Sequence, residues 1–510
     1  MKSVTRTAAL VTGAVAMLVA PLAAMKAMQD PGDPRLTVGA APAATLVPGD
    51  VRDATGRMIA GAVWTGLVSY DPRTGSPVMA SAESVTSEDR RVWTVRLRPG
   101  GRFHDGTSVT ARSFTDAWTA VLREGWHGAA MFADVARVKG AAVRADGVEG
   151  LKVTDDRTFE VTLDRPLNGF PSLLGDPAFL PMPESVLRSR DWASYGRRPI
   201  GNGPLRVAAH GPKETVLERP GSGPGARSIA VKAMPDAAKQ YAAVELEDLD
   251  VATAVPPGRH ETMDSEFRDR HLTVAGRTMT HLAFPSWEER FTPAVRQALS
   301  MAIDRNAIAE GALGHQATPA NSLVPPGVRF GRREGPCRLC LHDARAATSA
   351  LDDAGGFKGT LTLWHAKADS AWVEALADQL RKVLTLDVQP QPVTPAELQA
   401  ALDERRVDGP FVMHTTAAYP VPVAALRPLL EARTGYEDDY VSGLLTQAES
   451  APTPETGVTP ARLAESALLR DMAAMPLWSG HDHYVWSERL SGLTSAPFTG
   501  LRLDRLALKG

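Results

Sequence analysis

The amino-acid sequence predicts a mixed α/β fold divided into more than one domain. At 510 residues the chain exceeds the size at which one hydrophobic core keeps growing, so two or three domains are expected. Residues 92–97 and 159–163 alternate apolar and polar side chains, which is typical of strands with one buried face. Within residues 361–404, strand-like and helix-like segments follow one another. This order indicates an α/β lobe with a largely parallel sheet.

The first 28 residues have the pattern of an export signal. One lysine and one arginine precede an uncharged apolar run over residues 7–25. A signal peptidase could cut near Ala24. Alternatively the run, which has roughly the ~20 residues needed to span a bilayer, stays as a membrane anchor or folds as an ordinary buried helix. The basic start favours export of the remainder, and the turn-rich residues 29–35 are expected to form a linker.

The overall composition is that of a folded soluble protein without a nucleic-acid partner. Hydrophobic residues make up 44% and charged residues 23% of the chain, and the formal net charge is −3 from 56 basic and 59 acidic residues. The sequence has no polybasic run or basic stripe, so neither nucleic acid nor an anionic membrane surface is expected as a main partner.

The two cysteines, Cys337 and Cys340, stand alone as a pair. No second Cys-x-x-Cys and no histidine pair occurs at zinc-finger spacing, so no metal and no cofactor are expected. In an exported chain we expect a small structural disulfide that closes a surface turn after Gly335 and Pro336. A redox-active pair and two free thiols remain the alternatives.

Local patterns place the elements of the N-terminal half. Residues 36–40 are expected to be the first strand, and Trp93, Val95 and Leu97 should share the buried face of another. Asp105 and Gly106 indicate a turn, so we expect no catalytic role for His104 and Asp105. Thr110 is a suitable N-cap for the helix that follows, whose apolar stripe comprises Phe114, Ala117, Trp118, Val121 and Leu122.

The C-terminal half contains the clearest helix signal. Thr292 is expected to cap it and Pro293 to occupy its first position, and the pattern predicts one helix over residues 291–313. The following elements are then a strand, a helix, a second strand and a capped helix, over residues 361–366, 370–384, 386–393 and 394–404.

Five stretches together resemble a known family. They occur in the order and at the spacing found in the extracellular solute-binding proteins of family 5, which are receptors of ABC importers for oligopeptides, dipeptides and nickel complexes. The stretches are GLVSYDPRTGSPVMASAESV, WTVRLRPGGRFHDGTSVTA, PIGNGPLRV, AVRQALSMAIDR and ANSLVPPGV. The resemblance covers residues 36–510 and implies a two-lobed periplasmic-binding-protein-like fold of the large three-part type, hinged by two crossover segments.

The resemblance also implies domain boundaries. Lobe I is expected to hold residues 36–62, 185–275 and 480–510, with residues 63–184 as its subdomain, and lobe II is expected to hold residues 276–479. The crossover segments would be residues 272–284 and 475–486.

The implied function is that of an extracytoplasmic solute-binding protein. It would be a monomer without enzymatic activity that closes its lobes on a peptide-like or other small polar ligand and delivers it to an ABC permease. Met25 stands where lipoprotein signals of the family carry the lipid-accepting cysteine. We therefore expect a secreted protein, or one held at the outer membrane face by its uncleaved N-terminal segment. Two alternatives are a metal-complex receptor, in which His481 and His483 would share one face of a strand, and a recruited role in specialised biosynthesis.

The expected ligand site lies mainly within residues 414–426. Peptide-binding relatives carry an aspartate that neutralises the ligand ammonium at the place that Ala418 occupies here. This difference predicts a ligand other than an ordinary free peptide, unless another carboxylate serves the ammonium. The candidate ligand-binding residues are His414, Thr415, Thr416, Ala418, Tyr419 and Trp478, with Asn202 and Trp364 as weaker ones, and each aromatic could instead belong to the core.

Overall fold

The computed structural model describes residues 35–331, 335, 337–431 and 434–509. The expected signal sequence and all but the last residue of the expected linker lie outside them. Within the described part of the chain, no helix is both long and apolar enough to cross a membrane.

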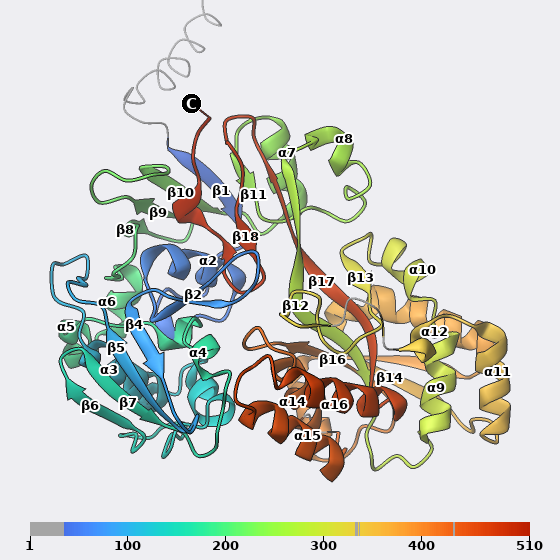
Figure 1. Cartoon of the computed structure of the whole chain (residues 1–510). Helices are drawn as coiled ribbons and strands as arrows, with labels where there is room; N and C mark the ends of the chain where they lie inside the picture. The colour runs from blue at the N-terminus through green and yellow to red at the C-terminus, as the bar shows by residue number, and fades with distance from the viewer. Residues whose placement is uncertain (1–34, 332–334, 336, 432–433, 510) are drawn as a thin grey trace, which may run out of the picture.

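The chain forms two lobes that share one eleven-stranded mixed sheet (Figure 1). Lobe II contributes one end of this sheet and lobe I the other, and the two long strands β12 and β17 run between the lobes. The strand order is β15 (Val388–Val393), β14 (Leu361–Ala366), β16 (Phe411–Thr416), β12 (His271–Ala283), β17 (Ala474–Trp486), β11 (Val251–Ala252), β1 (Leu36–Ala40), β10 (Ser228–Ala233), β9 (Glu214–Glu218) and β8 (Arg206–His210), and β13 (Ala317–Pro319) pairs with β17.

Lobe I also contains a separate four-stranded sheet. Its order is β4 (Ala82–Thr86), β5 (Val92–Leu97), β7 (Thr158–Thr162) and β6 (Leu151–Asp155). The predicted alternation in β5 is confirmed, since Trp93, Val95 and Leu97 are buried. The predicted helix is α3 (Ala111–Glu124), which begins after Thr110 and has its whole expected apolar stripe buried.

Short elements complete lobe I. Its remaining helices are α2 (Ala54–Val63), α4 (Phe170–Leu173), α5 (Glu184–Ser189), α6 (Trp192–Arg197), α7 (Ala237–Glu245) and α8 (Met263–Phe267), and its two-stranded ribbons are β2 (Val68–Tyr70) with β3 (Pro77–Met79) and β18 (Ser495–Ala496) with β19 (Gly500–Leu501).

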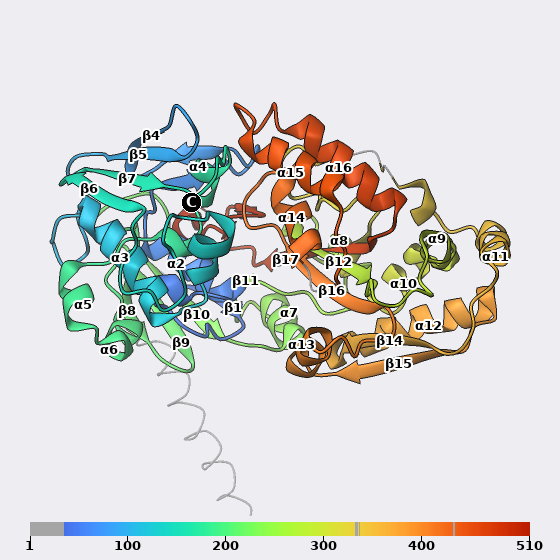
Figure 2. The ribbon, with the colours of Figure 1, turned by 90° about the horizontal axis from the view of Figure 1, so that it is seen from below.

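Lobe II packs helices around the β15-β14-β16 end of the shared sheet (Figures 1 and 2). The predicted parallel arrangement is confirmed here, because β14 runs parallel to both β15 and β16. The helices are α9 (Pro293–Ala302), α10 (Arg305–Glu310), α11 (Ala344–Asp353), α12 (Ser370–Leu384), α13 (Pro395–Asp403), α14 (Val423–Glu431), α15 (Asp439–Ser450) and α16 (Val458–Arg470).

The expectation of one helix over residues 291–313 is wrong. Thr292 caps α9 and Pro293 starts it, as predicted, but α9 ends where Ile303 adopts an extended conformation. Asp304 then caps α10 by accepting a hydrogen bond from the Ala307 N–H at 3.1 Å. The Ile303 side chain is fully buried, so tertiary packing overrides the continuous helical pattern at this point.

The predicted disulfide between Cys337 and Cys340 is present. The turn lies at the surface, since Arg338 and Leu341 are exposed, but the two cysteines themselves are buried. The buried guanidinium of Arg305 explains part of this burial: it donates to the Cys340 carbonyl at 3.0 Å and to the Pro476 carbonyl at 2.8 Å. The disulfide turn is thereby fixed to the first helices of lobe II and to the start of β17.

Strands β12 and β17 form an antiparallel ladder that is interrupted at its centre. Its register shifts between Ala275 and Met279, so Gly276, Arg277 and Thr278 bulge out of the pairing. A Cβ atom on Gly276 would lie 2.4 Å from the Gly480 carbonyl oxygen. The two backbones therefore cross in direct contact at this bulge.

Two buried histidines lie on these strands on either side of the bulge. His281 bonds the Thr415 hydroxyl at 2.8 Å, and His483 bonds the Thr273 hydroxyl at 3.2 Å. Burial, together with the neighbouring His414, lowers the pKa of His281 to about 3. Burial likewise lowers the pKa of His483 to about 3, with His260 and His481 acting in the same direction. Both rings are therefore neutral near pH 7.

We predict that a side chain at Gly276 destabilises the fold. In Gly276→Ala the Cβ atom displaces the crossing strand, and overpacking of this kind costs about 1–3 kcal/mol. The matched control is Gly480→Ala, because a Cβ at Gly480 meets no atom within 4 Å. Urea unfolding should give a lower midpoint for G276A alone, and equal midpoints for both variants would contradict this view of the crossing.

We predict that stability falls on acidification below about pH 6.5. In the unfolded chain a histidine gains its proton near pH 6.5, whereas His281 and His483 in the folded state do so only near pH 3. The unfolded state therefore binds more protons between pH 6.5 and pH 5. Over this range each histidine should lower the free energy of unfolding by about 1–2 kcal/mol.

Urea midpoints measured from pH 7.5 to pH 5 test this expectation. His483→Gln should show a shallower pH dependence than the wild type. His342→Gln, at an exposed histidine, serves as the control and should keep the wild-type slope. A slope that H483Q leaves unchanged would assign the acid sensitivity to other groups.

Candidate functional site

A cavity of about 600 Å³ lies between lobe I and the crossing strands. Most of its wall comes from four segments, which are the start of α2 with the residues before it, the bulge of β12, the centre of β17 and the C-terminal residues 497–501, and His127 and Thr253 add single contacts. Thr416 at the end of β16 adds a contact from lobe II, and its hydroxyl lies 2.9 Å from that of Thr278. Both lobes therefore contribute residues to the wall of one cavity.

Two of the charged residues on the cavity wall are held by the fold itself. Asp53 caps α2 by accepting from the Gly56 N–H at 2.7 Å, and its second oxygen accepts from the Ala44 N–H at 2.9 Å. Arg57 forms an ion pair with the buried Asp176 at 2.7 Å. Burial opposes ionisation of Asp176, but Arg57 lowers the net pKa of this carboxyl below its usual value.

Two other charged residues, Arg277 and Asp482, face the cavity from the crossing strands. The Arg277 guanidinium lies over the Phe498 ring, 5.4 Å from its centre, and donates to the Ala417 carbonyl at 3.3 Å. Burial and the nearby Arg57 lower its pKa. Burial raises the pKa of Asp482, an effect that Arg277 opposes. Asp482 is an exposed residue of the cavity wall.

A polar contact joins the lobes at the edge remote from the crossing. The Asn168 amide nitrogen lies 2.8 Å from the Ala448 carbonyl, 3.0 Å from that of Ala451 and 3.2 Å from that of Thr453, all at the end of α15 or just beyond it. Asn168 comes from lobe I, directly before α4, and α4 faces α14 and α15 of lobe II in Figure 1. We refer to this contact as the Asn168 bridge.

The candidates on β16 are separated by the alternation of the strand. Thr416 reaches the cavity, whereas Thr415 is buried against His281. His414 lies on the same face as Thr416, with Nε2 3.2 Å from the Asp369 carboxylate and Nδ1 3.1 Å from the Thr280 hydroxyl.

The next two candidates, Ala418 and Tyr419, do not line the cavity wall. Tyr419 is buried, and a Cβ atom on Gly169 would come within 2.4 Å of its ring. Ala418 is half-buried against the hydrophobic core. Tyr419 therefore packs between the lobes.

The remaining candidates make structural contacts. Trp478 is buried with its ring edge-on to Trp372, at a centroid distance of 4.5 Å. Asn202 bonds both the N–H and the carbonyl of Thr65, at 3.0 and 2.9 Å. The structure does not bring these two side chains to the cavity wall.

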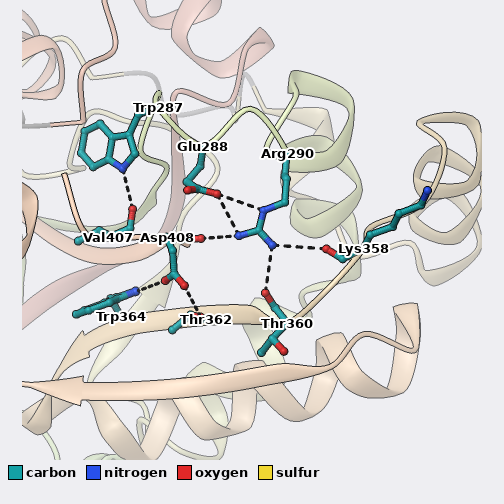
Figure 3. A network of polar contacts seen from close by, with 9 residues as sticks. All are labelled: Trp287, Glu288, Arg290, Lys358, Thr360, Thr362, Trp364, Val407 and Asp408. Carbon is teal, nitrogen blue, oxygen red and sulfur yellow. Dashed lines mark hydrogen bonds and ion pairs between the residues drawn. The ribbon is translucent and has the colours of Figure 1, made fainter.

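Trp364 belongs to a polar network on the outer side of lobe II (Figure 3). Its indole N–H donates to the Asp408 carboxylate at 2.9 Å. Arg290 completes the network by donating to the Asp408 carbonyl at 2.9 Å and by pairing with Glu288 at 3.1 Å. The network fixes the loop before β16 to the start of α9 and explains the position of Trp364.

Sequence reasoning missed Arg57, Arg277, Asp482 and Phe498. The His-Asp-His stretch of β17 contained a usable signal, because side chains alternate along a strand and Asp482 therefore faces away from the side of His481 and His483. Sequence reasoning considered only the two histidines. In the described part of the chain, no three His, Cys, Asp or Glu side chains lie close enough to hold a metal ion. The cavity offers charged, aromatic and hydroxyl groups suited to noncovalent binding of a small polar molecule.

Comparison with known proteins identifies the family. The model of the bacterial extracellular solute-binding proteins, family 5, matches residues 76–436. The periplasmic murein peptide-binding protein MppA of Escherichia coli strain K12 is 25% identical over 452 residues, with 82% of each chain covered. The glutathione-binding protein GsiB of Shigella dysenteriae is 22% identical over 499 residues, which covers 90% of this chain and 91% of GsiB.

A solved structure extends the similarity to the fold. MppA in its unliganded open form superposes with a TM-score of 0.78 at 21% identity, covering 93% of this chain and 96% of that one. The predicted two-lobed α/β fold is thereby confirmed. Since the family model spans more than half of the sequence, this chain belongs to the bacterial extracellular solute-binding proteins of family 5.

Proposed function

We propose that this protein is the extracytoplasmic receptor of an ABC importer and that it captures a peptide-like ligand between its lobes. The family supports a solute-binding role, and the names of MppA and GsiB, a murein peptide-binding and a glutathione-binding protein, point to short peptides or close derivatives. The role requires binding and lobe movement without covalent chemistry.

The observation that carries this proposal is the position of the 600 Å³ cavity. Its walls include α2 of lobe I, both crossing strands and Thr416 of lobe II. A ligand in this volume contacts both lobes at once, so it binds the closed arrangement more tightly than the open one and shifts the population toward closure. The volume lies in the range of about 300–1,000 Å³ that is usual for small-molecule sites.

We further propose the division of the chain that its sequence suggests. Residues 36–62, 185–275 and 480–510 form lobe I, residues 63–184 its subdomain, and residues 276–479 lobe II. The break of the β12–β17 ladder between Ala275 and Met279 supports a hinge at the boundary between residues 275 and 276.

The cellular setting follows from the same role. We infer that the N-terminal 28 residues direct export and that the mature monomer works outside the cytoplasm. Because Met25 replaces a lipid-accepting cysteine, the protein is either released or held by the uncleaved segment. An ABC permease would recognise the closed lobes.

We predict that a bound peptide makes the protein more compact. Native mass spectrometry against a pool of tripeptides to pentapeptides, with glutathione and a murein tripeptide included, should find at least one ligand. Small-angle scattering with that ligand should give a smaller radius of gyration than the free protein gives. A radius that stays unchanged with every bound candidate would contradict lobe closure.

We predict that the Asn168 bridge stabilises the closed state. Asn168→Ala removes the amide that faces three carbonyl groups, and the loss of about 1–2 kcal/mol should weaken binding of the best pool member by about 5- to 30-fold. Calorimetry measures this change. Asn306→Ala, at an exposed position on α10, is the control and should bind as the wild type does. Equal affinity of both variants would remove the bridge from the closure mechanism.

A further inference from the structure

The charged groups of the cavity differ in whether the protein already neutralises them. Asp53 caps a helix and Arg57 pairs with Asp176, so the fold engages both. Arg277 and Asp482, in contrast, have no ion-pair partner within 4.0 Å among the described residues, and no such pair joins them to each other. These two side chains therefore have charge to offer to a ligand.

Asp482 is placed to accept a cation. It lies opposite Val274 in the β12–β17 ladder and faces the cavity beside Tyr484. Among the described residues no hydrogen-bond donor contacts its carboxylate, which is exposed to solvent at the cavity wall. A carboxylate in such surroundings is stabilised by an ammonium group that donates hydrogen bonds to it.

Arg277 is placed to bind an anion. The bulge of β12 removes this residue from the ladder, and the Phe498 ring supports its guanidinium from one side. Its hydrogen bond to the Ala417 carbonyl at 3.3 Å uses one N–H of the five that a guanidinium carries. The remaining N–H groups suit a carboxylate, which guanidinium binds through two parallel hydrogen bonds.

We propose that the cavity selects zwitterionic ligands, with Asp482 accepting the ligand ammonium and Arg277 binding its carboxylate. The inference rests on the proposed function of the cavity. In this arrangement the crossing strands recognise the charges of the ligand, and Asp482 provides the carboxylate that is absent at Ala418. Both recognition groups lie at the hinge, so a ligand with opposite charges at two points fixes β12 relative to β17.

The test uses three pools of tripeptides to pentapeptides whose side chains are uncharged. The peptides of the first pool have free ends, those of the second are N-acetylated, and those of the third are C-amidated. Native mass spectrometry ranks the pools on the wild type, and calorimetry gives dissociation constants for the best member in its three forms. Acetylation should weaken binding by about 10- to 100-fold, and amidation should weaken it similarly.

Variants then assign each effect to a residue. Asp482→Asn should weaken binding of the free peptide by about 10- to 100-fold and hardly change binding of the acetylated peptide. Arg277→Gln should likewise weaken binding of the free peptide and hardly change binding of the amidated peptide. Asp353→Asn, which removes an exposed carboxylate at the end of α11, should bind all three forms as the wild type does. Thermal unfolding of each variant verifies that it folds.

The outcomes separate this inference from the proposed function. If blocked and free peptides bind the wild type equally well, or if D482N keeps the full preference for a free amine, the inference is wrong while peptide binding stands. If none of the three pools binds the wild type, both are wrong. The comparison of blocked with free peptides needs no variant, so it decides the matter even if D482N does not fold.

Discussion

The crossing of β12 and β17 is the constraint on which the rest of the structure depends. These strands are the two connections between the lobes, and each belongs to the sheet that both lobes share. At Gly276 the backbones meet so closely that a side chain would strike the carbonyl of Gly480. The pairing of β12 with β17 is interrupted there, and the residues left unpaired include Arg277, which faces the cavity. One local departure from regular pairing therefore sets both the hinge and the chemistry of the site.

Adjacent residues on β17 serve opposite purposes. His483 points into protein and stays neutral, so it stabilises the strand without a buried charge. Asp482 points into the cavity, where burial makes its ionised form less stable until a counter-charge arrives. A ligand that supplies this charge gains most when the lobes are closed and water is excluded, which couples recognition to closure. The site thus depends on two charged groups that form no ion pair within the described part of the chain.

Much of the fold could be predicted because it is encoded locally. The alternation at β5, the cap at Thr110 and the Pro293 start of α9 depend on neighbours in the sequence, and all three are found. The break at Ile303 was missed because its cause is tertiary packing. The site was harder still. Its charged residues come from segments far apart in the chain, and a buried aromatic such as Trp478 has the same sequence pattern whether it faces a core or a cleft. The family motifs gave the architecture and left the ligand-facing residues open.

The central claim is that ligand charge is recognised at the crossing strands, between the lobes. A crystal structure of the protein with its best-binding peptide tests this most directly. The account predicts electron density for the peptide in the 600 Å³ cavity, with its ammonium within about 3 Å of the Asp482 carboxylate and its carboxylate bonded to Arg277. A peptide bound elsewhere, or bound in this cavity without a contact to either side chain, would contradict the account.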